Sequence, residues 1–144
     1  MVSIQQRKSD VTTILRPDHF TIVTDRLSET KEFYEEVLGF LPGPRPDFKF
    51  PGLWLYANEA ACLHVVEVEQ MPAARKGVLD HMAFRGEGVN VLIDKLKSLN
   101  LDYRIMRTPD PWVQWQVFFQ DPNGADVEVD FDGNEALSPE NIPA

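Results

Sequence analysis

Two short stretches decide the fold of this sequence: "DHFTIVT", residues 18–24, and "LDHMAFR", residues 79–85. Each contains an Asp-His pair that is followed by the apolar and β-branched pattern of a strand. Because the same pair stands at the head of a strand twice, the sequence indicates an internal repeat. His19 and His81 are therefore either surface residues at two strand ends or residues aimed into a site.

A helix-type pattern follows each of these two strands. In "LSETKEFYEEVLGF", residues 27–40, four apolar side chains share one face, with Ser28 as the expected N-cap and Gly39 as the stop. Residues 88–103 repeat the pattern. The two predicted apolar faces consist of Leu27, Phe33, Val37 and Leu38 in the first helix and of Val89, Leu92, Ile93, Leu96 and Leu99 in the second.

Strand-like runs separated by turn signals complete both halves. A proline-rich loop follows the first helix, and the turn "QDPNG" separates the last two strands of the second half. The predicted fold class is α+β, with two βαβββ modules that form a cupped mixed sheet and carry their helices on its outer face. The expected boundaries are an N-terminal extension at 1–16, a domain at 17–131 with modules at about 17–70 and 79–131, and a C-terminal tail at 132–144.

Composition limits the classes of partner. The chain of 144 residues is 43% hydrophobic and 26% charged, which is typical of one globular domain with a substantial core. Its formal charge of −9 repels phosphate backbones and anionic membrane surfaces, so we expect neither nucleic acid nor a membrane as a partner. A single cysteine, no apolar stretch of membrane-spanning length and no secretory pattern in residues 1–16 predict a cytoplasmic location.

Four residues with metal-ligand chemistry occupy related positions. Strand alternation places His64 and Glu128 on the faces opposite their apolar neighbours, so both point away from the helix-covered core. From His19 to His64 is 45 residues, and from His81 to Glu128 is 47. Imidazole and carboxylate groups suit divalent Zn, Ni, Co, Mn or Fe(II) and leave coordination positions for a substrate.

Over residues 18 to about 131 the sequence resembles the vicinal oxygen chelate superfamily, which includes glyoxalase I, bleomycin-resistance proteins and extradiol dioxygenases. The resemblance rests on "DHFTIVTDRLSETKEFYEEVLGF", "LDHMAFR" and "FFQDPNGADVEVDF". It implies a divalent metal held by His19, His81 and Glu128, with His64 where glyoxalase-like members have a fourth ligand. Those members usually carry Glu or Gln at that position, so the sequence leaves open whether His64 is a ligand or a base. The resemblance also implies a homodimer.

The resemblance implies further contacts with a small-molecule substrate. Gln116 and Phe118 fall on a strand that commonly contacts substrate in the superfamily. Arg107 and Trp112, like Arg45 and Trp115, are candidates for binding an aromatic or anionic substrate, although each also fits an ordinary surface or strand position. Cys62 is expected to be a small core or cavity residue.

The implied activity is that of a metal-dependent lyase or isomerase of glyoxalase or epimerase type. Such an enzyme stabilises an enolate on the metal while a side chain, for which His64 and Glu128 are the candidates, moves the proton. The alternatives are an Fe(II) dioxygenase and a metal-free binding protein of the bleomycin-resistance kind. Residues 108–124 lack the His and Tyr that extradiol enzymes typically carry there, which disfavours ring cleavage.

Overall fold

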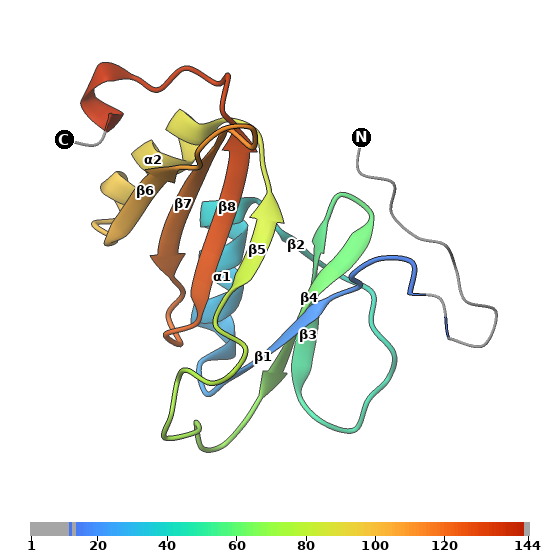
Figure 1. Cartoon of the computed structure of the whole chain (residues 1–144). Helices are drawn as coiled ribbons and strands as arrows, with labels where there is room; N and C mark the ends of the chain where they lie inside the picture. Colours follow the sequence, from blue (N-terminus) through green and yellow to red (C-terminus); the bar gives the residue numbers. More distant parts are fainter. Residues whose placement is uncertain (1–11, 13, 143–144) are drawn as a thin grey trace.

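The computed structural model, which describes residues 12 and 14–142, consists of two βαβββ modules in sequence (Figure 1). The predicted α+β fold class is therefore confirmed. The elements of the first module are β1 (Phe20–Thr24), α1 (Leu27–Leu38), β2 (Leu41–Gly43), β3 (Gly52–Ala57) and β4 (Ala60–Glu67). Those of the second are β5 (Met82–Arg85), α2 (Val89–Ser98), β6 (Tyr103–Arg107), β7 (Gln114–Gln120) and β8 (Asp126–Asp132), followed by a 3₁₀ turn at Pro139–Asn141.

Both modules have the same sheet topology. The strand orders are β1-β4-β3-β2 and β5-β8-β7-β6, with the first and last strands of each module parallel and the other pairs antiparallel. This order places the strand that follows each Asp-His pair beside the last strand of its own module. The edge strands β1 and β5 meet through Phe20 and Phe84, whose rings make an edge-to-face contact with centroids 5.9 Å apart.

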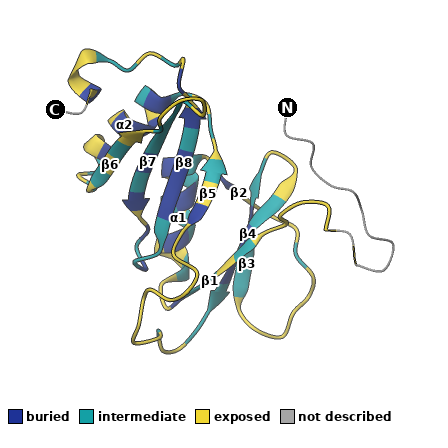
Figure 2. Ribbon diagram, viewed as in Figure 1, coloured by how far each residue is buried: buried dark blue, intermediate teal, exposed yellow. Residues whose placement is uncertain are grey.

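Apolar residues of both modules form one core, which includes the buried parts of β7 and β8 (Figure 2). Helices α1 and α2 lie behind the second sheet in Figure 1, and α1 also packs against β2 and β4. Val89, Ile93 and Leu96 are fully buried, which confirms the predicted face of α2. Neither helix among the described residues is both long and apolar enough to span a membrane.

Two local predictions for the first module need correction. Ser28 lies inside α1 and does not cap it; Arg26 precedes the helix without a side-chain cap, and the Thr30 hydroxyl donates to the Arg26 carbonyl over 2.9 Å. Gly39, with φ of 68°, ends the helix as predicted. The proline-rich loop contains the exposed strand β2, whose place at the sheet edge tolerates a proline because that side makes no ladder bonds.

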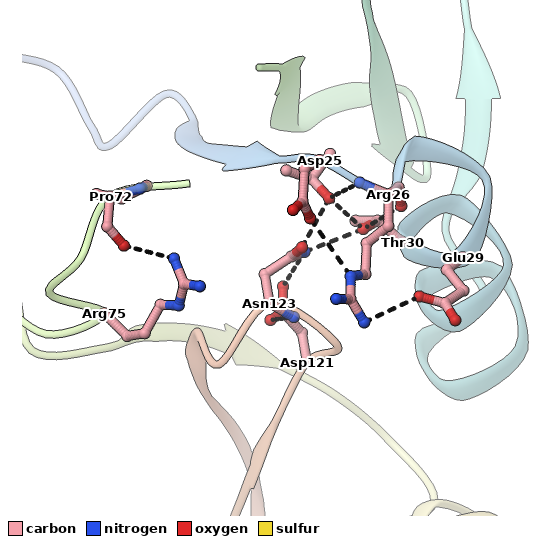
Figure 3. A network of polar contacts seen from close by, with 9 residues as sticks. Asp25, Arg26, Glu29, Thr30, Pro72, Arg75, Asp121 and Asn123 are labelled. Carbon is pink, nitrogen blue, oxygen red and sulfur yellow. Dashed lines mark hydrogen bonds and ion pairs between the residues drawn. The ribbon is translucent and has the colours of Figure 1, made fainter. Parts of the chain in front are cut away.

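A buried polar network joins the two modules (Figure 3). The Thr24 hydroxyl at the end of β1 donates to Asn123 Oδ1 over 2.6 Å, and Asn123 Nδ2 donates to Thr30 Oγ1 of α1 over 3.0 Å. The Tyr34 hydroxyl donates to Asp121 Oδ2 over 2.8 Å. Because Asp121 and Asn123 belong to the turn between β7 and β8, these bonds tie α1 and β1 of the first module to the second.

The two ends of the chain differ from each other. Of the predicted extension at 1–16, residues 1–11 and 13 lie outside the described residues. The predicted tail packs onto α2: the Glu135 carboxylate accepts hydrogen bonds from the backbone N–H groups of Gly88 and Val89, at the start of the helix. Asn141 is also buried against α2. A carboxylate at this position stabilises the positive end of the helix dipole.

Candidate metal centre

The repeated Asp-His pairs build the same local arrangement in both modules. His19 Nδ1 lies 2.7 Å from Asp18 Oδ2, and His81 Nδ1 lies 2.9 Å from Asp80 Oδ2. Because an ionised carboxylate can only accept, each Nδ1 carries its hydrogen, and Nε2 is the nitrogen that is left to bind a ligand. Histidines that bind metal are commonly oriented in this way by a carboxylate. Sequence reasoning assigned no role to the two aspartates, although the repeated pair was the signal.

The sheet register shows that His64 and Glu128 are equivalent residues. In the first module Phe20 pairs with Leu63, so His64 is one residue beyond that partner. In the second, Met82 pairs with Val127, and Glu128 is one residue beyond. The unequal spacings of 45 and 47 residues therefore lead to the same position in the two sheets.

In the first module the two histidines stack on each other. The rings of His19 and His64 have centroids 3.7 Å apart at 16°, and Trp54 stacks on the other face of His64 at 3.9 Å and 8°. Burial, and then the nearby His19, lower the pKa of His64. A neutral imidazole at pH 7 follows, and its unprotonated nitrogen can bind a metal or accept a proton.

In the second module a histidine faces a buried carboxylate. His81 Nε2 lies 2.8 Å from Glu128 Oε2, and Gln116 Nε2 donates to Glu128 Oε1 over 2.6 Å. Glu128 is only 5% exposed. The hydrogen bond to Asp80 is the largest of the effects that raise the pKa of His81, while burial and then the carboxyl of Asp130 raise the pKa of Glu128. This pair can therefore hold a proton that a metal would displace.

A further carboxylate, that of Asp130, lies on the strand that carries Glu128. Asp130 lies two residues from Glu128 on the same strand face, and its Oδ1 is buried without a hydrogen-bond partner among the side chains and backbone of residues 12 and 14–142. A buried carboxylate oxygen without a donor is stabilised by a nearby positive charge. Imidazole and carboxylate are donor types that suit a divalent transition metal, so His81 and Glu128 supply two of the donors that such an ion needs.

The four predicted ligands occur as two pairs. His19 contacts His64 in the first sheet, and His81 contacts Glu128 in the second. Within the part of the chain that the structure describes, no three His, Cys, Asp or Glu side chains are grouped so that they could hold one ion. Metal binding by these four residues stays a prediction.

The other predicted site residues divide into two groups. Phe118 meets His81 edge to face at 6.4 Å, carries the Arg104 guanidinium over its ring at 4.7 Å, and lines with both a cavity of about 750 Å³. Gln116 binds Glu128, which makes it a residue that positions the carboxylate. In the structure, both therefore lie beside the second pair.

Arg107 and Trp112 lie away from both pairs. The Arg107 guanidinium stacks on the ring of Trp115. Trp115 pairs with the core residue Phe131 across the strands, so Trp115 and Arg107 lie on the helix-covered side of the sheet. Trp112 is exposed in the turn between β6 and β7. Their role in substrate binding remains untested. Burial raises the pKa of the Cys62 thiol, which makes it a weaker nucleophile at neutral pH.

Comparison with known proteins shows the family of the chain. The family model described as "Glyoxalase/Bleomycin resistance protein/Dioxygenase superfamily" matches residues 16–129. The chain belongs to this superfamily. The resemblance inferred from the sequence is thereby confirmed, and the match covers both Asp-His pairs and Glu128.

Individual members of the superfamily share the sequence or the fold. "Glyoxylase I 4" of Arabidopsis thaliana is 30% identical over 119 residues, which cover 78% of this chain and 68% of that protein. A glyoxylase/bleomycin resistance protein/dioxygenase domain from Frankia sp. EAN1pec has a TM-score of 0.70 at 15% identity, covering 86% of this chain and 96% of that one. A lactoylglutathione lyase from Agrobacterium tumefaciens has a TM-score of 0.60 at 17% identity, with coverages of 84% and 96%.

Proposed function

We propose that this superfamily member is a divalent-metal-dependent lyase or isomerase of glyoxalase or epimerase type that acts on a small oxygen-chelating carbonyl compound. The observation that carries the proposal is the pair of register-equivalent half-sites, each with a histidine held at Nδ1 by the preceding aspartate. The similarity to Glyoxylase I 4 and the fold shared with lactoylglutathione lyase support the lyase class.

The four donors would hold the ion, and the remaining groups would orient them. Asp18 and Asp80 fix the rings of His19 and His81, and Gln116 fixes the carboxylate of Glu128. When bound, a divalent ion polarises the oxygens of a chelating substrate and lowers the pKa of the adjacent C–H group. The chain itself must then accept a proton: Glu128 can do so through a carboxylate oxygen, whereas the neutral ring of His64 can do so only when its unprotonated nitrogen is not bound to the ion.

We further propose that the two half-sites meet across a homodimer, with His19 and His64 from one protomer and His81 and Glu128 from its partner. Each half-site supplies two donors, and two pairs make the four-donor set that a divalent metal takes. Val78 and Leu79, directly before the second Asp-His pair, are 111% and 70% exposed, which fits a surface that a second copy covers. A twofold dimer would build two identical sites.

A complementation experiment tests this arrangement. His19→Ala disables the first half-site and Glu128→Gln the second, and Glu128→Gln keeps the shape of the side chain while removing its charge. Each variant alone should lose at least about tenfold in affinity for added Ni²⁺ or Zn²⁺. In a refolded 1:1 mixture, half of the dimers are mixed and each contains one intact site. About a quarter of the wild-type metal capacity should therefore return.

The outcomes separate the parts of the proposal. No recovery in the mixture, together with impaired single variants, would place all four donors within one chain. Unchanged metal affinity in both variants would refute the metal centre itself. Turnover of the hemithioacetal formed from methylglyoxal and glutathione, or epimerisation of an acyl-CoA, tests the lyase or isomerase class, whereas oxygen consumption with catechol would indicate the dioxygenase alternative.

A further inference from the structure

An aromatic cluster adjoins the first half-site and extends beyond the donors themselves. It consists of Phe48 and Phe50 in the loop before β3 and of Trp54 on β3. Phe48 and Phe50 stack at 5.0 Å and 13°, and Phe48 lies 6.3 Å from Trp54. Through the contact of Trp54 with His64, these rings and the two histidines form a continuous series.

The cluster is held in place by Arg45. Its guanidinium lies 5.2 Å from the ring centre of Phe48 and 5.3 Å from that of Phe50, and it donates to the carbonyls of Gly52 and Phe50 over 3.0 and 3.2 Å. A loop fixed by two backbone hydrogen bonds and two cation–π contacts keeps its rings in place without a ligand. The binding surface is therefore preorganised, which reduces the entropy lost on binding.

Two of the three rings, those of Phe48 and Phe50, remain open to solvent, and Trp54 is partly buried. Phe48 and Phe50 are 41% and 45% exposed, whereas the side chains on the opposite face of the sheet, such as Leu55 and Leu63, are fully buried. Exposed apolar rings at a fixed geometry favour a planar apolar group that can stack on them. Arg45 has its terminal nitrogens engaged by backbone carbonyls, so it is better suited to hold the rings than to bind an anion.

We infer that Phe48, Phe50 and Trp54 bind an aromatic ring of the substrate, so that the substrate is an aryl-bearing carbonyl compound whose oxygens reach the neighbouring His64. This inference rests on the proposed function, because it takes His19 and His64 as part of the reacting centre. Its distinguishing consequence is selectivity: a phenyl group should be preferred over a methyl group on the same 2-oxo scaffold.

The test compares benzoylformate with pyruvate, which differ only in phenyl against methyl. Their binding is measured by calorimetry, with metal-free protein and with protein loaded with Zn²⁺. Benzoylformate should bind at least about tenfold more tightly in both forms, as expected for one well-placed aromatic contact together with its buried area. The Phe48→Ala/Phe50→Ala double variant should reduce this preference to less than about threefold. Val91→Ala, which removes an exposed apolar group from α2 away from the cluster, should leave the preference unaltered.

Each result has a defined meaning. Equal affinities for the two acids, or an unchanged preference in the double variant, would overturn the inference whatever the enzyme does. A preference for benzoylformate in a protein that turns over no hemithioacetal or acyl-CoA would refute the proposed function and leave the aromatic site standing. If the double variant instead becomes monomeric while the wild type is dimeric, the cluster is an interface between copies and the inference fails. Trp54→Phe, which keeps a ring against His64, should retain the preference.

Discussion

Replacing Asn123 with Ala should destabilise the fold by about 2 kcal/mol, because Asn123 connects the two modules through buried hydrogen bonds. Each threonine hydroxyl has one hydrogen to donate. Thr30 donates to the Arg26 carbonyl over 2.9 Å, and Thr24 donates to Asn123 Oδ1 over 2.6 Å. The acceptor site of Thr30 is filled by Asn123 Nδ2 over 3.0 Å.

The expected magnitude follows from which bonds can be replaced. Asn123→Ala removes both side-chain bonds to the threonines, but the hydrogen of Thr24 can turn to Thr30 Oγ1, which is only 3.0 Å away. The short bond from Asn123 Nδ2 to Thr30 is therefore lost outright at about 1 kcal/mol, together with the longer 3.4 Å bond from Nδ2 to Asp121 Oδ2, and the space left by the buried amide contributes a similar amount. Thr24 and Thr30 are fully buried, so their hydroxyl groups depend on partners within the protein.

Urea denaturation followed by tryptophan fluorescence measures the effect. Asn134→Ala, the same substitution in an exposed turn, is the matched control and should change the free energy of unfolding by less than about 0.5 kcal/mol. In a double-mutant cycle with Thr24→Val, the coupling to Asn123→Ala should be about 1 kcal/mol. An Asn123→Ala effect no larger than that of Asn134→Ala, or strict additivity in the cycle, would refute the reasoning.

Two further predictions concern the histidines. His64→Ala should weaken Co²⁺ affinity at least about tenfold and alter the Co²⁺ absorption spectrum. The control variant Cys62→Ser should keep both the affinity and the spectrum. If His64→Ala instead keeps full Co²⁺ occupancy and an unaltered spectrum but loses turnover, His64 is a base and not a ligand. In metal-free protein, NMR titration should show His81 taking up its proton at higher pH than His64, on either side of the ordinary pKa of about 6.5. Because folding raises the pKa of His81, protonation of His81 stabilises the fold fully below about pH 6.5, and this stabilisation is lost as the pH rises through the folded-state pKa. Folding lowers the pKa of His64, which has the opposite effect, because acid then favours the unfolded chain. Titration of His64 above His81 would contradict both assignments.

Local patterns in the sequence predicted the elements and their repetition. The period of apolar residues from Val89 to Leu96 places one face of α2 against the core, and strand alternation places His64 opposite Leu63 and Val65. These features depend on neighbours within a few residues, which is why sequence reasoning finds them. The N-cap of α1 was missed because Thr24 and Thr30, which are held by tertiary contacts, satisfy backbone groups around Arg26.

The sequence by itself determined the chemistry that is available: two Asp-His pairs, a third histidine and a strand glutamate, repeated within one βαβββ pattern. Only the tertiary structure decided how these groups are distributed. The parallel register makes His64 equivalent to Glu128, and the packing of the modules leaves the donors as two pairs on separate sheets. The stack of Trp54 on His64 and the bond from Gln116 to Glu128 likewise join residues on neighbouring strands. Such contacts depend on strand register and on packing between elements distant in the sequence, and composition and local periodicity do not encode either one.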